Sequence, residues 1–342
     1  MKKKLINYVV LIGIIIISFK VLFSNLNPKV FYDTIKMADG RFLVLGILCM
    51  FVYWGLEALM MDNLMKKVDS QMTFWSAFKT TIIGQYYSFL TPFASGGQPM
   101  QLYELGKDRM SMGNATAVLV SKFLIFQITV TIYSMGLFLI RIQSLFGNLK
   151  AATSFIVIGL AINVVGLTMI ILMAFKPKQV EKIGHFIIEG LWRIKLLRRR
   201  ERAYERLRVL TDEYQMAMRH FHEDIKNTFW LFFLSVIQLT VFFSVTYLVY
   251  LALGLRGASY IDIISLQAML YMAVSFIPVP GTAGASEIGF SILLGSIFTA
   301  HLLTMAILLW RGISYYFGLV FCGLFTLSVH LAEKRRIKSQ TG

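Results

Sequence analysis

The length, composition and charge of this chain exclude a soluble domain. Its 342 residues are 57% hydrophobic and only 15% charged, whereas soluble domains carry about 25% charged residues. The formal net charge of +16 does not indicate a nucleic-acid partner, because the basic residues lie between long apolar runs, as in the loops of membrane proteins. The sequence therefore predicts a polytopic integral membrane protein.

Apolar runs long enough to cross a bilayer, which takes about 18 residues or more, recur along the chain. No small-residue cleavage pattern follows the first run, so it is expected to stay as a span and not to be removed as a signal peptide. The predicted fold is an all-α membrane helical bundle, one domain over residues 1–342 with halves at 1–175 and 228–332. The expected full spans, about six, are 5–23, 42–61, 113–140, 152–175, 229–254 and 300–331.

Residues 176–227 are the long polar section between the halves, with 13 Lys/Arg against 8 Asp/Glu. Apolar residues at helical spacing predict an amphipathic helix on the membrane surface, although a solvated linker helix fits equally well. The basic run at 198–200 favours the cytoplasmic side. The residues at helical spacing are Tyr204, Leu207, Leu210, Tyr214 and Met218.

Two stretches interrupt apolar segments with proline and glycine. The first, at 88–105, reads SFLTPFASGGQPMQLYEL, and the second, at 275–287, reads SFIPVPGTAGASE. Proline lacks the amide donor and glycine adds backbone freedom, and such backbone exists at membrane depth only inside protein or along a wet cavity. We therefore predict two re-entrant hairpins, at 73–108 and 263–298, whose breaks form one site, as interrupted segments in corresponding halves do in transporters.

The distribution of basic residues fixes the expected topology. The N-terminal lysines, the 176–227 section and the C-terminal tail should all be cytoplasmic, so both chain ends are predicted inside a multi-pass protein of the inner (cytoplasmic) cell membrane. The number of membrane crossings places all these segments on the cytoplasmic side only if neither hairpin crosses the bilayer. The hairpins then enter from opposite sides, which favours an inverted repeat around a shared site.

Ionisable side chains at membrane depth usually face a cavity or a partner. Lys122 and Arg311 would supply positive charge suited to a lipid phosphate, and Glu104 and Glu287, each after a break, are their expected partners. Glu57 lies close enough to the end of its span to be interfacial. For any one of these residues taken alone, a structural ion pair is the favoured interpretation, and only as a set do they indicate a site for a lipid phosphate.

The short helices after the breaks offer backbone amides that attract anions. Pro99 is expected as the first residue of one helix, and Ser286 as the N-cap of the other, which Glu287 would begin. The glycines could instead serve only close helix packing. The residues predicted to bind the lipid are Pro92, Gly96, Gly97, Gln98, Pro99, Tyr103, Glu104, Lys122, Pro278, Pro280, Gly281, Gly284, Ser286, Glu287 and Arg311.

Catalytic and metal-binding patterns are missing from the sequence. It contains no nucleophile elbow, P-loop or His-Glu-x-x-His motif. His220 and His222, two residues apart on a helix, would not face each other, and Cys49 and Cys322 show no metal spacing. We expect no catalytic residue, no metal and no cofactor.

At the two breaks the sequence resembles a known family. The stretch at 91–105, with a Pro, then Gly-Gly-x-Pro, then a short helix with an aromatic residue, resembles the first signature of the lysyl-phosphatidylglycerol synthase transmembrane-region family, the flippase-like membrane domain. Pro-x-Pro-Gly followed by Gly and Glu at 278–287 is similar to its second signature, although Thr282 stands where many members have a second glycine. Many members of the family carry an acidic–basic pair of residues near the position of Lys122, and this sequence has only the basic residue of that pair. The resemblance covers essentially the whole chain.

The resemblance implies a protein that binds anionic or aminoacylated phospholipid of the lysyl-phosphatidylglycerol type and moves it between leaflets, in a family linked to cationic peptide and antibiotic resistance. Two-part members add a soluble aminoacyl-transferase domain, for which this sequence leaves no room after its last span, so a stand-alone form without enzyme activity is expected. One alternative is a phosphatidylglycerol lysyltransferase-related protein or an accessory to a separate synthase or glycosyltransferase. Another is a membrane scaffold without transport.

Overall fold

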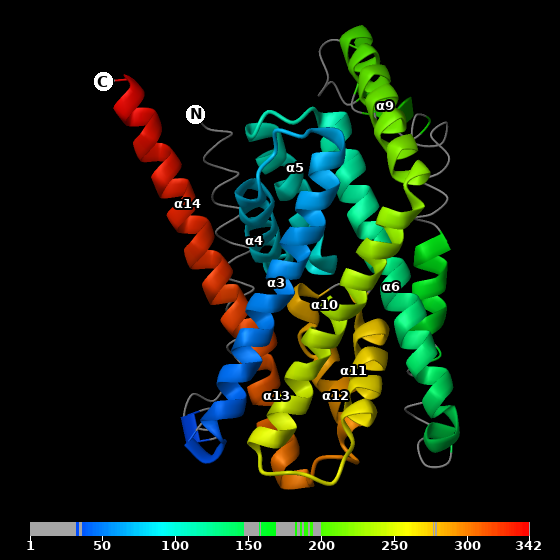
Figure 1. The fold of residues 1–342 in the computed structure, drawn as a ribbon, viewed down its shortest axis with the longest axis vertical. Helices are drawn as coiled ribbons and strands as arrows, with labels where there is room; N and C mark the ends of the chain where they lie inside the picture. Colours follow the sequence, from blue (N-terminus) through cyan, green and yellow to red (C-terminus); the bar gives the residue numbers. More distant parts are fainter. Residues whose placement is uncertain are drawn as a thin grey trace.

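The part of the chain that the structure describes is helical and contains no strand. The computed structural model describes residues 32–33, 36–146, 157, 159–168, 182, 185–186, 188–190, 192–193, 200–275, 277 and 279–341. Its helices form one elongated bundle (Figure 1). The predicted all-α membrane bundle is therefore confirmed.

Four of the described helices are long and apolar enough to cross a membrane, and they match four of the six expected spans. They are α3 (Gly40–Val68), the Met112–Ile140 part of α6 (Met112–Phe146), α10 (Ile225–Ala252) and the run Leu302–Lys334. The expected span at 5–23 lies outside the described residues. Within the expected span at 152–175, the structure describes a short apolar helix, Gly159–Thr168.

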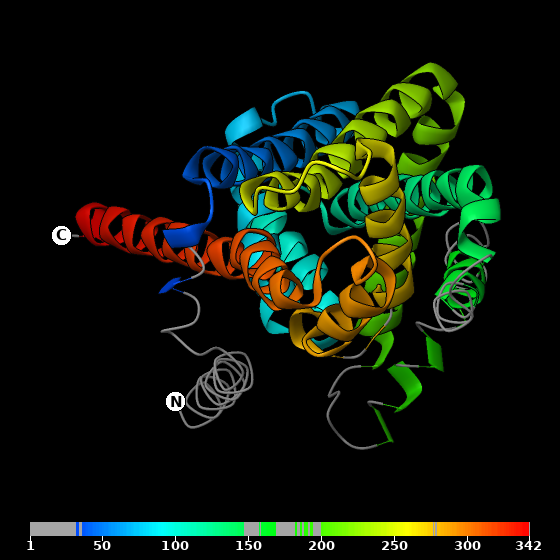
Figure 2. The same ribbon diagram turned by 90° about the horizontal axis from the view of Figure 1, so that it is seen from below.

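The last run contains a change of helix type. It consists of α13 (Ala300–Arg311), a π-helical turn, η3 (Gly312–Phe317), and α14 (Gly318–Thr341). Such π-helical turns inside helices frequently mark functional sites. Viewed from below, α14 leaves the bundle and extends to one side (Figure 2).

Helices α3 and α10 pack against each other along the bundle (Figure 1). Asp224 caps the start of α10 by accepting from the backbone N–H of Asn227 at 3.0 Å. The same carboxylate accepts from Lys67 in the last turn of α3. This Lys67 hydrogen bond holds the pKa of the Asp224 carboxyl below its usual value, and it joins the two spans at one end of the bundle.

Within the 176–227 section, the structure describes a helix, α9 (Arg200–Glu223), that packs against α6. Its Glu213 carboxylate accepts from the backbone N–H of Gly113 at 3.1 Å, near the start of α6. Tyr214 is buried. The predicted helix is thus present, and its position on the membrane surface stays a prediction.

The two interrupted stretches fold as helix pairs that approach each other from opposite ends of the bundle (Figure 1). The first pair is α4 (Phe74–Leu90) and α5 (Gly97–Lys107), joined by a short 3₁₀ turn, η1 (Pro92–Ala94). The second is α11 (Tyr260–Val274) and α12 (Ala285–Leu294), joined by η2 (Pro280–Thr282). At 17 and 15 residues, α4 and α11 reach about 25 Å and 22 Å at 1.5 Å per residue, short of a hydrocarbon core of about 30 Å.

The backbones of the two breaks repeat each other closely. Thr91 (φ −113°, ψ 145°) and Val279 (φ −124°, ψ 137°) are both extended. The prolines that follow them lead to Phe93 (φ 55°, ψ 17°) and Gly281 (φ 57°, ψ 17°), which share the left-handed conformation. The next residue is also left-handed in each break, with φ of 52°. This agreement supports the inverted repeat, and it pairs Pro92 with Pro280.

The starts of the two short helices differ from the sequence-based expectation. Helix α5 begins at Gly97, so Pro99 is its third residue. That position is tolerated because the first four N–H groups of a helix have no intrahelical partner. Helix α12 begins at Ala285 with Gly284 as N-cap at φ 81° and no side-chain cap. Ser286 therefore does not cap α12, and its hydroxyl bonds to that of Thr282.

Candidate functional site

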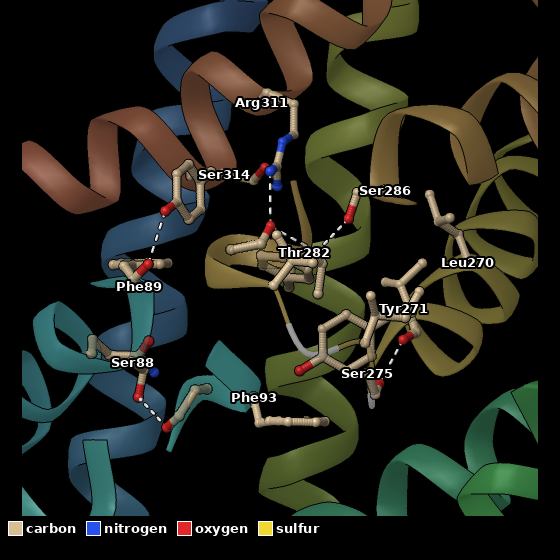
Figure 3. Close-up of a pocket in the computed structure, with 18 of the residues that line it drawn as sticks. Ser88, Phe89, Phe93, Leu270, Tyr271, Ser275, Thr282, Ser286, Arg311 and Ser314 are labelled. Carbon is tan, nitrogen blue, oxygen red and sulfur yellow. Dashed lines mark hydrogen bonds between the residues drawn. The ribbon is translucent and has the colours of Figure 1, made fainter. Parts of the chain in front are cut away.

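A cavity of about 410 Å³ lies between the two breaks and the helices around them. Figure 3 shows residues of both breaks at its wall, with Ser88, Phe89 and Phe93 opposite Thr282 and Ser286. The breaks also contact each other directly. Its polar and aromatic lining residues include Gln85, Ser88, Phe89, Phe93, Gln127, Gln267, Tyr271, Ser275, Thr282, Ser286, Trp310, Arg311, Ser314 and Tyr315, and the backbone of Gly281 lies among them.

Arg311 is a charged residue in this wall, and it is 5% exposed. Its Nε lies 2.7 Å from Glu287 Oε1, and its Nη2 donates to the carbonyl oxygen of Gly281 at 2.8 Å (Figure 3). The guanidinium also stands 4.6 Å from the centre of the Tyr315 ring. The expected pairing of Glu287 with Arg311 is therefore present, and it joins α13 to the second break.

Tyr315, in the π-helical turn, connects the two breaks. Its hydroxyl donates to the carbonyl oxygen of Phe89 at 2.9 Å, near the end of α4. A Cβ added to Gly281 would lie 2.1 Å from the Tyr315 ring, so the ring occupies the space that a side chain at this position would need. Phe93, at the corresponding position of the first break, instead has a side chain that is 57% exposed.

We expect Tyr315→Phe to lower the free energy of unfolding by about 1–3 kcal/mol, because the buried carbonyl of Phe89 loses its donor while the ring stays in place. Unfolding in detergent would measure this. Tyr103→Phe, at a tyrosine that is 55% exposed, is the matched control and should change little. Equal losses in both variants would contradict the bridging role.

A second buried ion pair lies behind the cavity. Lys122 Nζ lies 2.9 Å from Glu57 Oε1 and 3.3 Å from Gln101 Oε1. The other oxygen of Glu57 accepts from Gln85 Nε2 at 2.7 Å. The interfacial position predicted for Glu57 is wrong, because α3 continues to Val68 and places this carboxylate inside the bundle at 9% exposure.

Glu104 was expected to pair with Lys122, and this prediction is wrong. Glu104 is fully buried at 0% exposure and pairs with Lys107 at 3.0 Å, with Lys79 at 3.8 Å and His330 at 3.7 Å nearby. Helix α5 turns this residue toward α4 and α14, away from the cavity. Lys107 also reaches Glu333 at 2.6 Å, so these charges join the first hairpin to the C-terminal helix.

Of the fifteen predicted site residues, Gly281, Ser286 and Arg311 line the cavity. Gly96 and Gly97 serve close packing, since a Cβ at Gly97 would lie 2.0 Å from Ser88 Oγ. Pro278 lies outside the described residues. The structure places the remaining predicted residues outside the lining, and these are Pro92, Gln98, Pro99, Tyr103, Glu104, Lys122, Pro280, Gly284 and Glu287.

Sequence reasoning missed the neutral polar residues and the aromatic residues of the wall. Gln85, Ser88 and Gln127 were visible as polar residues in apolar segments, and that was the signal for them. Phe93 could be found only by aligning the prolines of the two breaks as Pro92 with Pro280. Among the described residues, no group of three His, Cys, Asp or Glu could hold a metal ion.

Comparison with known proteins gives the family. The family model described as "Lysylphosphatidylglycerol synthase TM region" matches residues 6–322. The chain is also 21% identical over 328 residues to a "UPF0104 membrane protein" of Archaeoglobus fulgidus, with 94% of this chain and 96% of that protein covered. Both matches include the two breaks. The chain therefore belongs to the lysylphosphatidylglycerol synthase transmembrane-region family.

Proposed function

We propose that the protein binds the headgroup of a membrane phospholipid in the cavity between the two breaks and moves the lipid between leaflets. The observation that carries this proposal is the meeting of two opposed broken hairpins at one cavity, which Arg311 and several neutral polar side chains line together with apolar residues. Secondary transporters bind substrates at such discontinuous helices near the midplane. Phospholipid of the anionic or aminoacylated type is the substrate class that the resemblance implies.

The volume of the cavity fits a headgroup. At about 410 Å³, it falls within the roughly 300–1,000 Å³ typical of small-ligand sites. Acyl chains need no place inside it, because they remain in hydrocarbon at no cost of transfer. The lipid would then present only its polar part to the breaks.

Arg311 is the side chain proposed to meet the lipid phosphate. A guanidinium has five N–H donors, and Glu287 and the Gly281 carbonyl engage only its Nε and Nη2. The remaining donors suit phosphate oxygens, for which arginine is well matched. The charge of Arg311 is already balanced by Glu287, so this contact adds hydrogen bonds more than net attraction.

The proposal is tested by reconstituting the protein in vesicles that contain a headgroup-labelled phospholipid and following its loss from one leaflet. We expect the wild type to accelerate exchange, and Arg311→Gln to slow it at least about tenfold, as loss of a hydrogen bond to a charged group predicts. Arg41→Ala, at a side chain that is 86% exposed, is the control and should exchange lipid normally. Exchange by the wild type no faster than in protein-free vesicles would refute the proposal.

A further inference from the structure

A cluster of charged side chains lies where the start of α4, the end of α5 and the C-terminal part of α14 meet. It consists of two lysines and three carboxylates, which are Lys79, Lys107, Glu104, Asp108 and Glu333. Taken together, these described side chains carry one negative charge in excess. Because Glu104 is fully buried, an unbalanced charge at this place is costly.

The two lysines are shared among the three carboxylates. Lys79 Nζ lies 2.9 Å from Asp108 Oδ1, 3.8 Å from Glu104 Oε2 and 3.9 Å from Glu333 Oε1. Lys107 Nζ lies 3.0 Å from Glu104 Oε1 and 2.6 Å from Glu333 Oε2. The neighbouring hydroxyl groups of α4 are neutral and leave the charge balance unchanged, and these are the phenol of Tyr87 and the Ser76 hydroxyl, which donates to Asp108.

His330 of α14 stands where a further positive charge is needed. Its Nε2 lies 3.7 Å from Glu104 Oε1. An imidazole is a cation with two N–H donors only when it is protonated, and histidine is the side chain whose charge changes most readily near neutral pH. The His330 side chain is 36% exposed, so water can deliver the proton that balances the cluster.

The rest of the contact between α14 and the first hairpin is apolar. A Cβ at Gly318 would lie 2.9 Å from the Phe89 ring, and the Phe325 ring stands 5.7 Å from that of Phe78 and 5.9 Å from that of Trp75. In a bilayer, lipid tails are as apolar as these side chains and compete with them for α14. The charged cluster therefore decides how firmly α14 stays on α4.

We infer that Glu104 and His330 form a proton-binding site that fastens α14 to the first hairpin. With the proton bound, the cluster is neutral and His330 pairs with Glu104, and a proton on either residue has this effect, so the two act as one site. As the pH rises and the proton leaves, the excess negative charge returns and α14 separates from α4.

The π-helical turn η3 is the hinge for this movement. It lies between α13 and α14, and its Tyr315 stays attached to the Phe89 carbonyl. The inference does not depend on the proposed lipid movement. It would affect that movement, because Phe89 lines the cavity and also lies against Gly318 of α14.

The test measures the distance between α4 and α14 by electron paramagnetic resonance of the full-length protein in nanodiscs. Spin labels are attached through Phe74→Cys and Leu331→Cys, at side chains that are 46% and 48% exposed, after Cys49→Ala and Cys322→Ala remove the native thiols. We expect a narrow distribution of short distances at about pH 5.5 and a broader, longer one at about pH 8.5, across the range in which histidine titrates.

Two neutral variants should shift this distribution in opposite directions. Glu104→Gln removes the excess negative charge and should give the short distance at both pH values, whereas His330→Gln cannot take up the proton and should give the long one at both. His185→Gln, at a histidine that stacks on Tyr204 outside the cluster, should keep the wild-type response. A wild-type distribution that does not change with pH would overturn the inference, and so would a pH response that survives His330→Gln or a shift in the same direction in both variants.

Discussion

Replacing Glu57 by leucine is expected to lower the free energy of unfolding by about 3–5 kcal/mol. The change leaves the Lys122 ammonium, which is 13% exposed, without its carboxylate partner at 2.9 Å, and removing one member of a buried ion pair strands a charge. Gln85 also loses the oxygen to which it donates. Reversible unfolding in detergent would measure the effect.

The double variant Glu57→Leu/Lys122→Met is the matched control for this prediction. It removes both charges, and replacing a buried pair by apolar residues is often neutral or stabilising. We therefore expect the double variant to recover most of the lost stability. If it is less stable than Glu57→Leu alone, the charge of Lys122 has another partner and the ion-pair argument is wrong.

Replacing Gly281 by alanine is the second change with a large expected effect, a loss of about 2–5 kcal/mol. The added Cβ would lie 2.1 Å from the Tyr315 ring, and overpacking of this kind costs about 1–3 kcal/mol. The φ of 57° adds about 1–2 kcal/mol for a residue with a side chain. Because Tyr315 also reaches Phe89, the displacement should disturb both breaks.

Gly284→Ala separates these two contributions. Gly284 has φ 81° and ψ −52° but nothing within 4 Å of an added Cβ, so this variant should lose only the backbone part, about 1–3 kcal/mol for a sparsely populated conformation. Thermal unfolding of both variants in the same detergent makes the comparison. Equal losses of unfolding free energy in the two variants would show that the contact with Tyr315 adds nothing to the cost of Gly281→Ala.

The parts of the fold that the sequence predicted are those set by local pattern. Continuous apolar runs mark spans, and proline with glycine marks backbone that cannot stay helical. The two breaks were therefore recognisable, and so was the pairing of Glu287 with Arg311, because both residues lie in apolar surroundings where a charge needs a partner.

The parts that it did not predict depend on distant contacts. Glu104 could not be placed because α5 folds back on α4 and brings this carboxylate close to Lys79 and His330, which lie far away in the sequence. Ser286 fits an N-cap by residue type, but Gly284, with its φ of 81°, is the N-cap, so the helix starts two residues earlier than expected. The left-handed backbone of Phe93 has no local signal, because residues with side chains rarely adopt it.

The positions of the neutral residues that line the cavity also depend on distant contacts. Gln127 was visible as a polar residue in a span, yet the orientation of its side chain depends on Asn163 and on the carbonyl of Met272, which belong to other helices. Lys122 was predicted to bind the lipid because of its charge, but it lies behind the cavity wall and does not line the cavity. In this bundle Arg311 and uncharged polar atoms face the cavity, whereas the Glu57–Lys122 pair and the charges around Glu104 join helices away from it.

The bridge from Tyr315 to Phe89 joins residues 226 positions apart, and it has a consequence for biogenesis. During synthesis the ribosome delivers the first hairpin long before the helix that carries Tyr315. Until then the end of α4 lacks this cover and must be sheltered by other protein or by water. Truncated nascent chains that stop before residue 311 should therefore leave Leu90, which is buried against Tyr315 in the full chain, accessible to thiol reagents when it is replaced by cysteine, and full-length chains should protect it.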